Sequence, residues 1–151
     1  MKNLIRLSKE AFPQWNKEII GRPELRDYCV RSNVIVLDHP TEYLGEYTIF
    51  ENRDCIVLDP SLRNEMKTWV FGHEIGHQLF HHPYEQQFGY KENLFKDKLD
   101  FEADFFVCVA MCPTKLLKIK TLWELVDEFG YPEEMLRIRK EIHERYKRDG
   151  L

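Results

Sequence analysis

Two histidines in one pentapeptide, His73-Glu74-Ile75-Gly76-His77, constrain the fold more than any other feature of the chain. Residues four apart lie on the same face of a helix, so both imidazoles can reach one metal ion if this segment is helical. The flanking sequence agrees, because Asp59-Pro60-Ser61 is typical of a helix start. Apolar spacing continues from residue 62 to about 81, and Pro83 is expected to end the helix. The sequence therefore predicts a helix over 62–81.

The residue types of this pentapeptide are those of a catalytic zinc site. Neutral histidine binds Zn²⁺ at about 2.0–2.1 Å, and zinc lowers the pKa of a bound water to about 7. Glu74 lies beside the histidine face, where it can accept a proton from that water and deliver it to a leaving amine. We therefore expect His73 and His77 to be zinc ligands and Glu74 to be the general base. The pentapeptide also arises by chance, so a third protein ligand is the test of this interpretation.

A second predicted helix, over 98–111, supplies candidates for the third ligand. It carries three acids, Asp100, Glu102 and Asp104, among apolar residues, and acids are seldom buried unless they are paired or bind a metal. Asp100 and Asp104 share one face of this helix, with the small Ala103 between them. Asp100 is the expected ligand, and Asp104 is expected to accept the N–H of a zinc histidine. Glu102 lies on another side, either in solvent or as the alternative third ligand if the register differs.

The remaining local patterns predict a single α+β domain over residues 1–151, without repeats or linkers. A small three-stranded sheet is expected to pack on the two helices that carry the histidines and acids. The catalytic core is expected over about 45–113 and a helical C-terminal part over 114–151. The predicted elements are a helix over 4–20 that is interrupted or restarted at Pro13, a helical stretch up to residue 31, a strand over 34–38, a hairpin over 46–58 with its turn at 52–54, a loop over 83–97, and helices over 121–129 and 132–148.

Charge and composition exclude several classes of protein. The net charge is −4, from 22 basic and 26 acidic side chains, so no bulk basic field for nucleic acid is present. The last helix mixes acids with its bases, so direct binding of nucleic acid is not expected. The chain shows no signal peptide and no apolar run of membrane-spanning length. We therefore expect a cytoplasmic protein with four reduced cysteines, of which Cys108 and Cys112 are buried.

Further side chains are weaker candidates for the site. His81 continues the spacing of His73 and His77, and it either faces the site or caps the end of the helix. His82 and His39 are expected at the surface. A side chain that stabilises the transition state is also expected. The candidates for that role are Tyr84, Tyr90, Tyr131 and His143.

Two segments together carry a family resemblance: LDPSLRNEMKTWVFGHEIGHQLFHH and, after it, LDFEADFFVCVAMCP. Their motifs, in this order and with this gap, resemble the ImmA/IrrE-type zinc metallopeptidases, which are gluzincin-like zincins. The first motif is shared by many zincins, and the pair is much more specific. The family's third ligand is a Glu four residues before an Asn or Asp. An ungapped match through Ala103, Asp104 and Pro113 places Asp100 at that position, so this chain departs from the pattern.

The resemblance implies a zinc-dependent metalloendopeptidase. Relatives of this type cleave a cognate repressor with a helix-turn-helix domain, so the implied partner is a helix-turn-helix transcriptional regulator or an antitoxin-like protein. The alternative is a non-catalytic or structural-zinc module that acts by binding such a regulator, as in a toxin–antitoxin or phage-type pair. The Asp in place of Glu keeps that alternative open.

Overall fold

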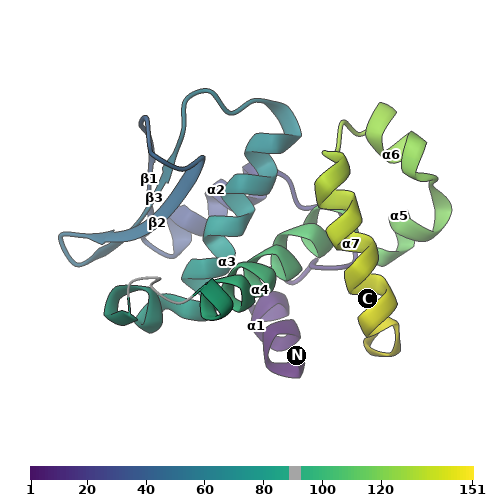
Figure 1. Ribbon diagram of the computed structural model, residues 1–151, viewed down its shortest axis with the longest axis horizontal. Helices are drawn as coiled ribbons and strands as arrows, with labels where there is room; N and C mark the ends of the chain where they lie inside the picture. Colours follow the sequence, from purple (N-terminus) through teal and green to yellow (C-terminus); the bar gives the residue numbers. More distant parts are fainter. Residues whose placement is uncertain (89–92) are drawn as a thin grey trace.

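The computed structural model describes residues 1–88 and 93–151, and it describes side chains for residues 1–80 and 98–151. Helices make up most of this α+β fold, and one small sheet lies at the left edge of the molecule, beside α2 and α3 (Figure 1). The α-helices are α1 (Lys2–Ala11), α2 (Arg22–Arg31), α3 (Asn64–Phe88), α4 (Asn93–Met111), α5 (Thr114–Ile119), α6 (Leu122–Asp127) and α7 (Glu133–Tyr146), followed by the short 3₁₀ helix η1 (Lys147–Asp149). The α+β class and the three strands expected from the sequence are confirmed.

The sheet contains β1 (Ile35–Asp38), β2 (Gly45–Phe50) and β3 (Arg53–Leu58), in the order β1-β3-β2. β1 runs parallel to β3, and β2 runs antiparallel to it. The hairpin turn consists of Glu51 and Asn52, both with positive φ (50° and 63°), as a two-residue turn of this kind requires. The turn therefore lies slightly earlier than the predicted 52–54. β2 forms one edge of the sheet, beside α3 (Figure 1).

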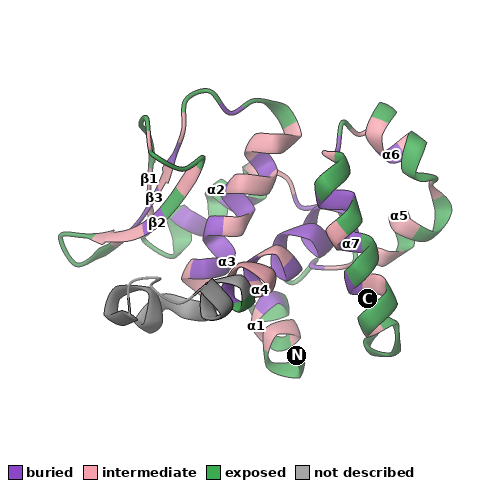
Figure 2. Ribbon diagram, viewed as in Figure 1, coloured by how far each residue is buried: buried purple, intermediate pink, exposed green. Residues whose placement is uncertain are grey.

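Helix α4 is the centre of the core. Its residues from Phe105 to Met111 are each at most 1% exposed, so this part of the helix is covered on all sides. A helix that is apolar all round is a core helix, and Figure 2 shows buried residues concentrated along α3 and α4. The indole Nε1 of Trp15 donates to the main-chain oxygen of Phe106 (2.9 Å) and ties the N-terminal segment to α4. All four cysteines are buried and unpaired, as expected for reduced thiols.

Several predicted boundaries are wrong, mainly around prolines. The first helix ends at Ala11 and does not resume after Pro13, because the chain turns back there through Asn16, which has a φ of 60°. The following α2 matches the helical stretch expected up to residue 31.

The loop expected over 83–97 is helical over 83–88, in α3, and over 93–97, in α4. Proline removes only one N–H donor from a helix, and Tyr-Glu-Gln-Gln-Phe after Pro83 contains good helix formers. Near the other end of α3, the first helical residue is Asn64, two residues later than expected. The short α5 was not predicted.

Within residues 1–88 and 93–151, no helix combines the length and the apolarity needed to cross a membrane.

Candidate metal centre

Helices α3 and α4 touch each other at Gly76 and Ala103. A Cβ added to Gly76 would lie 2.8 Å from the Cα of Ala103 and 2.9 Å from its carbonyl oxygen, closer than real Cβ atoms come. The missing side chain of Gly76 therefore lets the two backbones meet. This contact brings the histidines of α3 opposite the acids of α4.

Replacing Gly76 with Ala is expected to destabilise the protein and weaken its metal site. Ala favours a helix by about 1 kcal/mol over Gly, but here the new methyl group meets backbone, which no side-chain rotation can relieve. Overpacking of this kind costs about 1–3 kcal/mol. Denaturant unfolding and zinc affinity would measure both effects.

Gly21→Ala is the matched control, because a Cβ there would meet its nearest atom, an oxygen of the Glu24 side chain, at an ordinary 3.4 Å. We expect its unfolding free energy to change by less than about 1 kcal/mol. A Gly76→Ala variant with unchanged stability and unchanged zinc affinity would contradict the close contact between the helices.

Three potential ligand atoms converge at the α3–α4 contact. The Nε2 of His77 lies 3.0 Å from the Nε2 of His73 and 3.0 Å from Oδ1 of Asp100, and the His73–Asp100 distance is 3.4 Å. The ligand atoms of these residues all lie within 4.8 Å of one another. Two imidazole nitrogens and one carboxylate oxygen form a donor set that suits Zn²⁺. In the part of the chain that the structure describes, no other group of three such side chains meets this criterion, and Glu102 is not part of the group.

Asp104 orients one of the two imidazoles. Its Oδ1 lies 2.9 Å from Nδ1 of His73 and accepts a second hydrogen bond, also 2.9 Å, from Nε1 of Trp69. Because a carboxylate only accepts, Nδ1 of His73 is the donor. With Nδ1 held as the donor, Nε2 faces His77 and Asp100 and is the nitrogen that can bind a metal once it has lost its proton.

The histidines and carboxylates of the site shift one another's pKa values. Burial alone would lower the pKa of His73, but the hydrogen bonds that its ring donates to Asp100 and Asp104, and the nearby charges of Asp104 and Glu74, raise this pKa to about 10. Burial would raise the pKa of Asp100, yet His73 and His77 hold it well below its usual range. A proton on His73 therefore offsets part of the carboxylate charge, and a metal bound at its Nε2 would displace that proton.

The candidate ligands open into a cleft of about 860 Å³ between the β2 side of the sheet and α3. Glu74 lines this cleft although it is only 8% exposed. A Cβ added to Gly45, at the start of β2, would lie 3.3 Å from a carboxylate oxygen of Glu74, so the strand passes close to that carboxylate. The cleft is lined by Thr41–Thr48, Asp59, Met66, Trp69, Val70, His73, Glu74, His77, Asp100 and Asp104.

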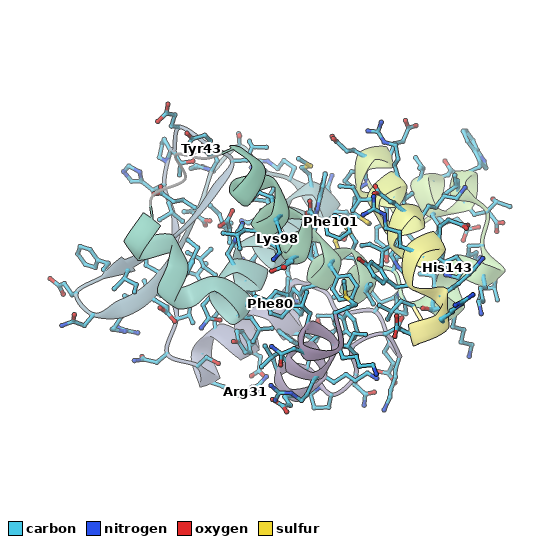
Figure 3. All side chains as sticks on the ribbon, turned by 60° about the horizontal axis from the view of Figure 1, so that its bottom comes forward. Arg31, Tyr43, Phe80, Lys98, Phe101 and His143 are labelled. Atoms are coloured by element: carbon cyan, nitrogen blue, oxygen red, sulfur yellow. The ribbon has the colours of Figure 1, made fainter. Side chains whose placement is uncertain are left out.

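Two of the sequence-predicted candidates for transition-state stabilisation lie away from the cleft. The hydroxyl of the buried Tyr131 donates to the main-chain oxygen of Met111. Nδ1 of His143 lies 2.6 Å from the main-chain oxygen of Leu151. Figure 3 shows His143 on α7, on the opposite side of the molecule from Tyr43 and the sheet. Neither Tyr131 nor His143 lines the cleft.

Tyr43 lines the cleft and was not a candidate in the sequence. It lies between β1 and β2 and is 61% exposed. Irregular segments have no periodicity that would indicate which way a side chain points, so no sequence signal identified it. His39, in the same segment, is exposed as expected. The candidates His81, His82, Tyr84 and Tyr90 lie outside the residues whose side chains are described.

A peptidase family model, described as the IrrE N-terminal-like domain, matches residues 31–141. The chain belongs to this family. The IrrE N-terminal-like match begins at the end of α2, includes the whole sheet and both site helices, and ends within α7. Searches of curated proteins and of solved structures gave no significant match.

Membership of the IrrE N-terminal-like family makes the chain metallopeptidase-like, and the geometry adds a group of side chains able to hold a metal ion. The donor set fits such an ion, because two imidazoles and a carboxylate meet beside an open cleft.

Proposed function

We propose that the protein is a zinc-dependent metalloendopeptidase. In this proposal His73, His77 and Asp100 hold the zinc ion, and Glu74 is the general base. The observation that carries it is the convergence of the three ligand atoms beside a buried glutamate in an open cleft. Three protein ligands leave a position free, as catalytic zinc sites require.

Each protein group has a defined task in this mechanism. Zinc, when bound, supplies a Lewis acid that acidifies water and polarises the peptide carbonyl. The carboxylate of Glu74 takes the proton from the attacking water and passes it to the nitrogen of the leaving amine. Its burial keeps bulk water from competing for that proton, and Asp104 holds the His73 ring in place.

The charge of the cleft supports a basic substrate. Beyond the metal centre, its lining includes the acids Glu42, Glu46 and Asp59, and none of the described lining residues is Lys or Arg. Such a cleft favours positively charged peptide segments. Transcriptional regulators with a helix-turn-helix domain bind DNA through basic surfaces. We therefore propose that the substrate is a regulator of this kind, cut within or beside a basic segment.

The test is to incubate the zinc-loaded protein with the product of the neighbouring gene, the proposed helix-turn-helix regulator. We expect the regulator to be cut into discrete fragments, which mass spectrometry would identify. A chelator should stop cleavage, and added zinc should restore it. An unrelated helix-turn-helix regulator is the control and is expected to remain intact. A stable complex without fragments would contradict the protease and support the alternative, a module that acts by binding the regulator.

A further inference from the structure

One indole on α3 is hydrogen-bonded to the carboxylate that orients the His73 ring. Trp69 lies one helical turn before His73, and its Nε1 donates to Oδ1 of Asp104. The same oxygen accepts the Nδ1–H of His73, and both distances are 2.9 Å. A single carboxylate oxygen of α4 therefore joins two side chains of α3.

The two indoles that contact α4 have different partners. Trp15 is fully buried and donates to a main-chain oxygen, that of Phe106, which satisfies a buried donor within the core. Trp69 is only partly buried and lines the cleft, and its N–H donates to a side chain, that of Asp104. Its partner is thus the carboxylate that also accepts from His73, and not the backbone of the core.

We propose that Trp69 is a positioning residue of the metal centre and acts through Asp104. The inference rests on the proposed role of His73 as a zinc ligand. The terminal torsion of an aspartate is broad and roughly two-fold, so one hydrogen bond leaves the carboxylate free to turn. A second donor fixes which oxygen faces His73. That oxygen then fixes the imidazole ring, with Nε2 directed at His77 and Asp100.

The test measures zinc affinity of the full chain by competition with a chromophoric chelator at constant pH. Trp69→Phe removes the N–H and keeps an aromatic ring. We expect it to weaken zinc binding about 10-fold, at the lower end of the 10–100-fold effect of partners that orient metal ligands. Asp104→Ala should weaken binding at least as much. Adding Trp69→Phe to Asp104→Ala should change affinity by less than about 2-fold, because the residue acts through a carboxylate that is then absent.

Trp15→Phe is the matched control, since it removes an indole N–H that bonds to α4 away from the metal centre. It is expected to reduce stability without changing zinc affinity. The proposal is overturned if Trp69→Phe binds zinc within 2-fold of the natural chain, or if its effect adds in full to that of Asp104→Ala. These measurements do not depend on proteolysis. If the protein binds zinc but cleaves no substrate, the proposed function fails and the role of Trp69 can still be tested. A natural chain that binds no zinc would overturn both this inference and the proposed function.

A second measurement leaves Trp69 in place, in case Trp69→Phe does not fold. The chain has three tryptophans, and each gives one indole N–H signal in a ¹⁵N-labelled protein. Trp123 is 74% exposed and serves as the internal reference. We expect the Trp69 signal to shift on addition of zinc and to lose protection from solvent exchange in Asp104→Ala, while the Trp123 signal stays constant. A Trp69 signal that responds to neither change would overturn the proposal.

Discussion

Replacing Glu74 with Gln is expected to abolish peptide hydrolysis while zinc stays bound. The amide has nearly the same shape as the carboxylate but cannot accept a proton, and general acid–base catalysis contributes about 10²–10⁴-fold to rate. Glu74 is not one of the three side chains whose ligand atoms converge, so the metal should be retained. The measurements are kcat on a peptide that contains the cleaved bond, and the zinc content of the purified variant.

Glu46→Gln is the matched control for this experiment. Glu46 is also a carboxylate that lines the cleft, but it is exposed and does not belong to the metal centre. Its loss should change KM for a basic substrate while kcat stays within a few-fold. If Glu74→Gln keeps kcat within 10-fold of the natural enzyme, Glu74 is not the general base. If it loses zinc, its role is structural.

The part of the site that a single helix determines could be predicted from the sequence. His73, Glu74 and His77 lie within five residues, and helical geometry alone fixes their relative directions. The face shared by Asp100 and Asp104 follows from the same rule. Their approach to the histidines does not, because it depends on contact between two helices at Gly76 and is therefore a tertiary property.

Other features lie beyond local patterns. Trp69 precedes His73 by one turn, and in the sequence it is simply part of an apolar stretch. Its hydrogen bond to Asp104 of α4 depends on the packing of the two helices, which the sequence pattern does not give. Tyr43 lies in an irregular segment, where no period indicates its direction. The errors at Pro13 and Pro83 have one cause: a proline constrains its own residue and its neighbours, whereas tertiary packing decides whether the helix continues.

Removing the side chain of Asp100 is expected to release tightly bound zinc, whereas Glu102→Ala should keep it. Asp is one methylene shorter than the Glu that the family resemblance places at this position, so α4 must lie close to α3 for Asp100 to bind. The structure shows that approach, because the backbones meet at Gly76 and Oδ1 of Asp100 lies 3.0 Å from Nε2 of His77. Glu102 is on the same helix and outside the converging group, which makes it the matched control.

We expect Asp100→Ala to weaken zinc binding by more than about 100-fold, since partners that only orient ligands already cost 10–100-fold. Chelator competition on folded protein, verified by circular dichroism, would measure this. Asp100→Glu adds a decisive comparison: the longer side chain must fit between helices already in contact, so it should bind zinc less tightly than Asp but more tightly than Ala. Equal zinc affinity of Asp100→Ala and Glu102→Ala would remove Asp100 from the ligand set. Loss of zinc in Glu102→Ala alone would mean that the rotated register of α4 supplies the third ligand.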